Sequence, residues 1–294
     1  MSGTRSRARR DFTLIELLVV IAILSALAAG AIAAYDGAGT NAITSVDMNN
    51  QSEVRRLLGA FFATHDGTYP DGWDSLLSAG AAGLSGGTAG STDADAGGTL
   101  FYRGEGGDAG SGTGDPSRGV FGQLRGWSPG AGFRKLTTYV LADEQRESLV
   151  RVDIGKVYDH DTSVLDCNES TAAATARTLA AGERVCIVDP STSLGASIYA
   201  DLGQTVDATP TDLSDDTFVL VVFGLGGRND LIGARSAGLA EAVYTEGAGQ
   251  GFYGRPLVVF RLPKGVYAEP QLVGVLDSEG DTIAVNKQKL AANQ

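Results

Sequence analysis

The longest apolar segment of the chain lies near its N-terminus and predicts a helix that crosses a membrane. Apolar residues dominate positions 12–35, and no charged residue occurs at positions 17–34. An apolar run of about 18 residues or more can span the hydrocarbon core of a bilayer. Positive charge on one flank places that flank in the cytoplasm, and four arginines precede this run: Arg5, Arg7, Arg9 and Arg10. We therefore expect a basic leader at 1–11, a transmembrane helix at 12–35 and an exported head.

A cleavable secretory signal peptide is the alternative interpretation of this run. Such a peptide has a short apolar core followed by small residues at its cleavage site, and the small residues at 28–31 would supply one. Two features favour the membrane helix. The run is longer than a usual signal-peptide core, and it contains an acidic residue, Glu16.

The helical pattern continues beyond the membrane over 36–64. Mostly apolar positions recur there at steps of three and four residues, as on one face of a helix: Ile43, Val46, Asn50, Val54, Leu57, Leu58, Phe61 and Phe62. Gly37 and Gly39 interrupt the pattern at a cost of about 1 kcal/mol each relative to Ala. They mark either a bend, a stretch that melts on assembly, or a simple kink or break. We expect the helix to end near His65–Gly67, because Gly is favoured just past a helix C-terminus.

The C-terminal half alternates helix-like and strand-like segments. Helices are expected at 136–150 and at the Ala-rich segment 171–181. Runs rich in Val, Ile and Phe, bounded by Gly, Pro or Asp, predict strands at 184–188, 217–223, 256–262, 272–276 and 282–285. Helices first and strands later suggest an α+β fold, with the long N-terminal helix packed on a mainly antiparallel sheet.

Between these halves lies a glycine-rich segment. Positions 80–132 hold 18 Gly in 53 residues, which predicts long loops because Gly loses the most entropy on ordering and has no side chain to pack. Asp93 and Asp95 in this segment either bind calcium, which takes several oxygen ligands, or lie in a solvated loop. Their spacing matches no calcium-loop motif, so the solvated loop is favoured.

Glu16 is the informative residue of the membrane segment. A carboxylate inside hydrocarbon costs on the order of 3 kcal/mol or more and usually has a functional partner. Arg9 and Arg10 could extend toward it from the cytoplasmic side. Alternatively, a neighbouring subunit presents a positive group at the same depth. The second interpretation makes Glu16 an assembly residue.

The segment FTLIELLVVIAIL, from Phe12 to Leu24, resembles the N-terminal signature of type IV pilins and type II secretion pseudopilins. The resemblance implies that a prepilin peptidase removes the leader by cleaving between Asp11 and Phe12, and that Phe12 is then N-methylated. It further implies that Glu16 contacts the N-terminal amine of a neighbouring subunit. Asp11 departs from the family pattern, which usually has Gly there. If the leader stays in place, the partner of Glu16 must be another group.

The resemblance extends to about Leu77. A helix that ends in an acid-Gly-x-Tyr-Pro turn, here 66–70, followed by a short Leu-containing helix, is similar to the major pseudopilin pattern. His65 at this helix end is expected to be a helix-terminal cation beside the helix dipole rather than a catalytic group. The segment 224–227, Gly-Leu-Gly-Gly, follows a predicted strand and is expected to be a turn, because it lacks the full phosphate-loop motif.

Charge and cysteine content narrow the chemistry. The net charge is −12, and the first eleven residues contribute +3, so the remainder carries −15. Such an acidic head disfavours nucleic acid, whose binding needs Lys and Arg. Two cysteines, Cys167 and Cys186, are too few for a zinc site. In an exported head they form either a disulfide, closing a loop of about 20 residues worth roughly 3 kcal/mol, or two buried thiols; the disulfide is favoured.

No enzymatic signature is evident in the sequence. The chain has two His and no metal-ligand spacing, so we expect neither an enzyme nor a cofactor. Some pseudopilins bind calcium in a C-terminal acidic loop. A second group of acids surrounds the strand at 217–223 without reproducing that motif, and calcium there stays an open possibility: Asp212, Asp215, Asp216 and Asp230.

Together these features predict a structural subunit of a type II secretion pseudopilus or type IV pilus-like filament. It would sit in the inner membrane as a single-pass protein with a cytoplasmic N-terminus and an extracytoplasmic head (65–294). The resemblance implies like subunits, the prepilin peptidase, an assembly platform and membrane lipid as partners. The alternative is a minor pilin or an uncleaved, membrane-tethered binding module.

Overall fold

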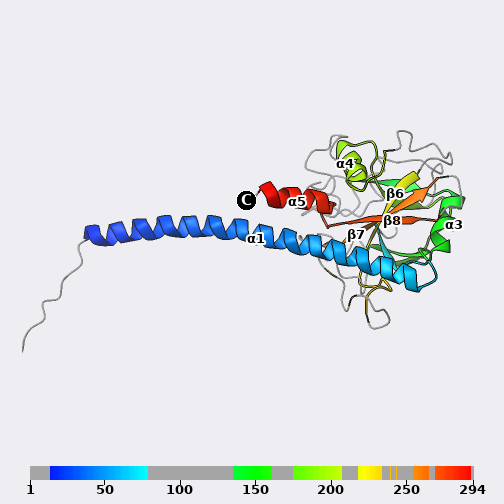
Figure 1. The fold of residues 1–294 in the computed structure, drawn as a ribbon, viewed down its shortest axis with the longest axis horizontal. Helices are drawn as coiled ribbons and strands as arrows, with labels where there is room; N and C mark the ends of the chain where they lie inside the picture. Colours follow the sequence, from blue (N-terminus) through cyan, green and yellow to red (C-terminus); the bar gives the residue numbers. More distant parts are fainter. Residues whose placement is uncertain are drawn as a thin grey trace, which may run out of the picture.

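A computed structural model describes residues 14–78, 135–160, 175–206, 218–233, 239, 243, 254–264 and 269–292. It shows one long helix, α1, attached at one end to a head of mixed helix and sheet (Figure 1). The other end of α1 projects away from the head. The leader at 1–11, Phe12, Cys167 and the Gly-rich segment at 80–132 lie outside the described residues.

Helix α1 runs without interruption from Leu14 to Thr64. It continues through Gly37 and Gly39, so the break that was one of the alternatives for these glycines is absent. The predicted end is confirmed: Asp66 and Gly67 take positive φ angles of 53° and 80°. The N–H of Gly67 donates to the carbonyl of Phe62 at 3.1 Å, which satisfies one of the last carbonyls of the helix.

The head is built on an eight-stranded sheet with the order β2-β5-β6-β1-β3-β4, and β7 and β8 continue from β6. Among the described pairs, β1–β3 is parallel and the others are antiparallel. The strands are β1 Trp73–Ser78, β2 Leu136–Val140, β3 Lys156–His160, β4 Thr175–Thr178, β5 Arg184–Val188, β6 Phe218–Gly224, β7 Leu257–Pro263 and β8 Gln271–Leu276. The remaining helices are α3 Asp143–Arg151, α4 Ser193–Asp201 and α5 Ile283–Ala292. The mixed fold with an antiparallel-rich sheet is confirmed.

The central strands have a core on each face. Along β6, Val219, Val221 and Phe223 belong to one hydrophobic cluster, while Phe218, Leu220 and Val222 belong to the other. Successive residues of β6 alternate between the two clusters because successive side chains of a strand point to opposite faces of the sheet. The first cluster includes Val54, Leu57 and Leu58 of α1, and the second includes Ile198 and Tyr199 of α4. The prediction that α1 packs on the sheet is confirmed for its second half.

Aromatic rings join the end of α1 to the sheet. The ring centroids of Phe62 and Tyr69 are 4.7 Å apart, and Tyr69 meets Phe260 of β7 edge-on at 4.9 Å. Phe260 also meets Trp73 edge-on at 5.6 Å. The backbone N–H of Leu272 in β8 donates to the Tyr69 hydroxyl at 3.2 Å. The turn after α1 therefore connects the helix to three strands.

The predicted apolar face of α1 is correct only at its C-terminal end. Ile43 and Val46 are 43% and 55% exposed, whereas Thr44, Asp47 and Gln51 are buried. The buried positions belong to a polar stripe that precedes the apolar one. Helix α5 lies alongside this part of α1 (Figure 1). Which side of α1 is buried here therefore cannot be told from the apolar residues of α1 alone.

Strands 184–188, 217–223, 256–262 and 272–276 are confirmed as β5 to β8 within a residue or so. The short Leu-containing helix predicted up to Leu77 is wrong, since Trp73–Ser78 is strand β1. Trp73, Leu76 and Leu77 are buried on the two faces of the sheet, so β1 lacks the alternation of apolar and polar residues that indicates a strand. The helix at 136–150 begins instead as β2, whose Tyr139 hydroxyl donates to Gln145 in the first turn of α3.

Two more segments differ, and two elements are found that were not predicted. The 171–181 helix is wrong: residues 175–178 are strand β4, where Arg177 is held by an ion pair to Asp159 of β3 at 2.7 Å. The 282–285 strand is wrong because the Thr282 hydroxyl accepts from the N–H of Val285 and starts helix α5. Strand β3 and helix α4 were missed.

We expect Leu58→Ala to destabilise the head by about 2–5 kcal/mol, the usual cost of truncating a buried Leu, because Leu58 is fully buried. Ile43→Ala on the same helix is the matched control, since Ile43 is partly exposed. Urea unfolding of the full chain in detergent, followed by circular dichroism, measures both. Equal losses for the two variants would contradict the docking of α1 through its second half.

Candidate functional site

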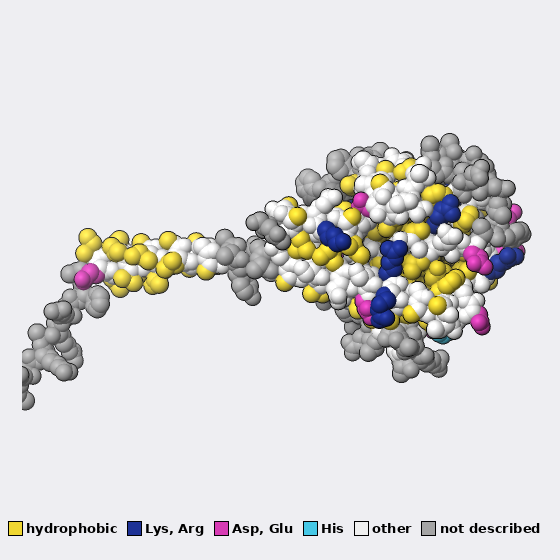
Figure 2. All heavy atoms as spheres, in the orientation of Figure 1, with side chains coloured by type: hydrophobic (Ala, Val, Ile, Leu, Met, Phe, Trp, Pro, Cys, Tyr) yellow, Lys and Arg dark blue, Asp and Glu magenta, His cyan; other side chains and the backbone are white. Residues whose placement is uncertain are grey.

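The N-terminal part of α1, Leu14–Ile32, is an exposed apolar rod. The segment from Leu14 to Ile32 is apolar enough to cross a membrane, and none of it is buried. Its 19 residues rise about 28 Å, close to the roughly 30 Å hydrocarbon core of a bilayer. Figure 2 shows the same rod as a hydrophobic surface extending from the head. By length and composition, α1 can span a membrane once.

Glu16 lies in the first turn of α1, among these exposed apolar side chains. Its neighbours Leu14, Ile15 and Leu17 are all more than half exposed. A carboxylate in the first turn is favoured by the helix dipole, which is positive at that end. Asp11 and Phe12, the predicted processing residues, lie outside the described residues, and their roles stay predictions.

Exposed apolar side chains continue past the length of the span. Ile43 and Val46 lie about 16 Å and 21 Å along the helix axis beyond Ile32, farther than the polar headgroup layer of about 5–8 Å extends on each side. We call the segment of α1 from Asn41 to Gln51 the neck. One flank of the neck presents Ile43 and Val46, and another flank carries the buried polar stripe.

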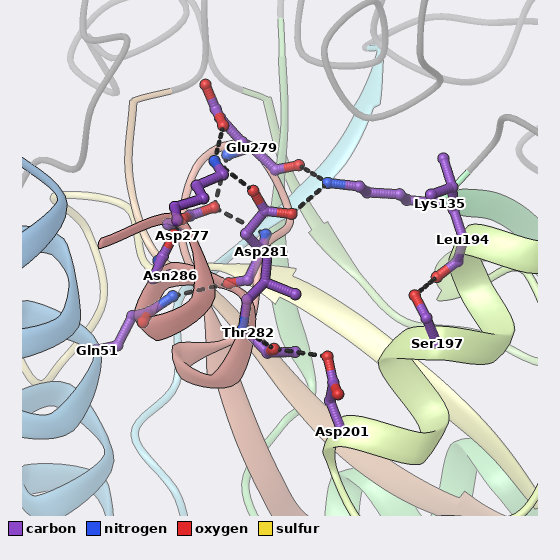
Figure 3. Close-up of polar contacts among 12 residues, drawn as sticks. Gln51, Lys135, Leu194, Ser197, Asp201, Asp277, Glu279, Asp281, Thr282 and Asn286 are labelled. Atoms are coloured by element: carbon purple, nitrogen blue, oxygen red, sulfur yellow. Dashed lines mark hydrogen bonds and ion pairs between the residues drawn. The ribbon is translucent and has the colours of Figure 1, made fainter. Parts of the chain in front are cut away.

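A cluster of carboxylates and lysines anchors the head beside the neck (Figure 3). Lys135 donates to the Asp281 carboxylate at 2.6 Å and to the Glu279 carbonyl at 2.8 Å. Lys289 of α5 lies 2.7 Å from Asp281 and 2.8 Å from Glu279. Asp277 accepts the backbone N–H groups of Glu279 and Asp281 at 2.9 and 2.8 Å. We call these five residues the carboxylate–lysine cluster.

Two further bonds connect this cluster to its surroundings. The Asn286 amide of α5 donates to Asp277 at 2.8 Å. The Gln51 amide of α1 donates to the Asp281 carbonyl at 2.8 Å. The cluster therefore links the loop after β8 to α1, to α5 and to the start of β2. Sequence reasoning missed it; the signal was the alternation of acids at 277, 279 and 281 directly after a strand.

Burial sets the charge states of this cluster. Burial, followed by repulsion from Asp281, raises the pKa of Asp277 to about 6. Burial would also raise the pKa of Asp281, but Lys135 and Lys289 outweigh it and hold that pKa below its usual value. Burial opposes the charge on Lys289, yet its bonds to Asp281 and Glu279 raise its pKa. Asp281 and Glu279 are thus paired with two ammonium groups of the same chain, those of Lys135 and Lys289.

The described residues contain no group of three His, Cys, Asp or Glu arranged to hold a metal ion. Asp93, Asp95, Asp212, Asp215 and Asp216 lie outside the described residues, so calcium there stays an open prediction. Asp230 lies in the turn region after β6, where its N–H donates to the Asp71 carbonyl at 3.0 Å.

Two smaller predictions lie in the head. The 224–227 segment leaves β6 for a turn, and a side chain at Gly226 would overlap the Asp74 carboxylate, so close packing explains that glycine. Cys186 is a free, fully buried thiol in β5, and burial raises its pKa. Its predicted disulfide partner, Cys167, lies outside the described residues, and the disulfide stays a prediction.

His65 stacks face to face on Phe61, with ring centroids 3.8 Å apart. Its Nδ1 lies 3.0 Å from the Phe61 carbonyl at the end of α1.

Comparison of the chain with protein-family models, curated proteins and solved structures finds no match.

Asp277→Asn should flatten the pH dependence of head stability. Because the pKa of Asp277 is raised from 3.8 to about 6, the folded state binds more protons than the unfolded chain between those values. Its stability contribution is therefore present at low pH and is lost as pH rises toward 6. Urea unfolding between about pH 4 and pH 7 measures this contribution as the difference between the wild-type and variant profiles.

Asp66→Asn is the control, since Asp66 is exposed in a left-handed conformation that Asn also tolerates. It should keep the wild-type profile. A wild-type profile in Asp277→Asn as well would show that Asp277 does not titrate in this range.

Proposed function

We propose that this protein is a structural subunit of a membrane-anchored filament of the type II secretion pseudopilus or type IV pilus kind. The observation that carries the proposal is the bare apolar half of α1 with Glu16 in its first turn, continuous with a second half buried in the head. Apolar helices of many copies would pack together in the filament core, and the heads would face outward.

Glu16 supports assembly more than simple anchoring. A carboxylate at hydrocarbon depth costs about 3 kcal/mol or more, a cost that an anchor gains nothing from. A positive group on a neighbouring subunit at the depth of Glu16, such as an N-terminal amine freed at Phe12, would stabilise the carboxylate and set the register between helices.

The neck gives a second, independent support. Ile43 and Val46 lie beyond the reach of lipid, yet they remain exposed in the monomer. An anchor needs apolar side chains only within the bilayer, whereas a helix that packs against other copies gains from apolar side chains on both sides of the membrane surface. The proposed interface therefore runs from the membrane segment into the neck.

The proposal places the head outside the inner membrane and gives the chain an assembly role rather than an enzymatic one. Like subunits, lipid, a prepilin peptidase and an inner-membrane assembly platform are the proposed partners. The acidic head disfavours nucleic acid as a partner.

Glu16→Gln should abolish or strongly reduce filament formation while leaving membrane insertion intact, because it removes the charge but keeps the side-chain shape. Glu53→Gln is the matched control: Glu53 lies on the same helix outside the span and pairs with Arg56 at the surface. Sheared-filament yield and membrane fractionation measure the two properties. Normal filament yield from Glu16→Gln would refute the register role of Glu16.

The alternative is an uncleaved, membrane-tethered binding module. Asp11 favours it, because an acid stands where the peptidase pattern has Gly, and the large head is compatible with binding a partner or cargo. Mass spectrometry of the N-terminus separates the two. A chain that begins at methylated Phe12 is expected for the filament subunit, and a chain that begins at Met1 or Ser2 would favour the tethered module.

A further inference from the structure

Helix α5 makes polar contacts with the rest of the head, and its apolar residues Ile283, Ala284, Val285 and Leu290 are half-buried. Asn286 is its one buried residue, and it donates to Asp277. Residues 287–289 and 291–292 are exposed. Its first turn is held through Thr282, whose hydroxyl donates to Asp201 of α4 at 2.8 Å. Unlike α1 and α4, α5 contributes no buried apolar side chain to either hydrophobic cluster.

The surface of α1 beside α5 is polar as well. Thr44, Asp47 and Gln51 form the buried stripe of the neck, and the apolar stripe of α1 begins only at Val54. No apolar side chain of α5 is fully buried, so the contact between the two helices has little of the apolar burial that dominates the stability of packed elements. Elements with few buried apolar contacts are those that open locally without unfolding the whole protein.

The ionic contacts of α5 are accessible to solvent. The Lys289 side chain is 42% exposed and its partner Glu279 is 37% exposed, so dissolved ions can screen this pair. Lys289 also reaches Asp281. By contrast, Lys135 and Asp281 are largely buried and hold the loop before α5 rather than α5 itself. Salt should therefore loosen α5 while the loop stays in place.

We propose that α5 is an ionically latched strap: it opens as a unit while the sheet stays folded, and it then uncovers the flank of the α1 neck that it lies alongside. Lys289 is the latch and the loop from Asp277 to Thr282 is the hinge. Opening makes a second flank of the neck accessible beside the one that carries Ile43 and Val46. This inference is independent of the filament proposal.

Hydrogen–deuterium exchange of the full chain in detergent micelles tests the strap. In the wild type, raising NaCl from about 50 mM to about 1 M, which shortens the Debye length to about 3 Å, should speed exchange of the α5 amides about fivefold. The amides of α4 and β7 should stay unchanged. Lys289→Gln at low salt should produce the same increase in α5, with little further response to salt.

Lys287→Gln is the matched control, because it removes the same charge from an exposed position of the same helix. It should exchange within about twofold of the wild type and keep the wild-type salt response. Any of three results would overturn the proposal: α5 amides that exchange only together with those of β7, α5 exchange that ignores both salt and Lys289→Gln, or an equal effect from Lys287→Gln.

Discussion

The fold depends on one helix being buried at only one of its ends. The sheet covers Val54, Leu57 and Leu58, and the aromatic contacts of Phe62, Tyr69 and Phe260 fix the turn that follows. Because α1 is unbroken, this docking also sets the direction of its bare half relative to the head. A bare apolar rod about 28 Å long is tolerated only in lipid or against other apolar helices. A membrane would provide the first environment, and the proposed filament core would provide the second.

The neck, which lies between the exposed apolar part of α1 and the part packed on the sheet, differs from both in its side chains. Its buried side chains are polar, and it lies alongside helix α5, which is held by Asn286 and Lys289 and has no fully buried apolar side chain. The carboxylate–lysine cluster brings the loop after β8, α1 and the start of β2 to one point. Lys135 and Lys289 supply the positive charge that these acids require. The head is thus rigid where the sheet holds α1 and more loosely held beside the neck.

The local pattern of apolar and polar residues predicted much of this fold. It missed the elements and contacts that depend on residues far apart in the sequence. The membrane helix and the strands β5 to β8 carry long apolar runs with clear boundaries. Strand β4 lies in the Ala-rich segment 171–181, whose composition predicts a helix, but the bonds of Arg177 to Asp159 and Glu183 hold the strand extended. The periodicity of apolar residues also failed in the neck: Thr44 and Asp47 are buried on the part of α1 that contacts α5, while Ile43 and Val46 are exposed. The lysines of the cluster are separated from its acids by as many as 146 residues, and no local pattern reveals such a pairing.

The central claim is that neighbouring copies meet through the first half of α1, and cysteine cross-linking in the membrane tests it directly. Single cysteines at successive exposed positions of Leu14–Ile32, in a background with Cys167 and Cys186 replaced by Ser, would be oxidised and the dimer yield measured at each position. We predict high yield at positions that recur with the helical period and low yield between them. Uniformly low yield, or yield that depends only on expression level, would contradict the claim.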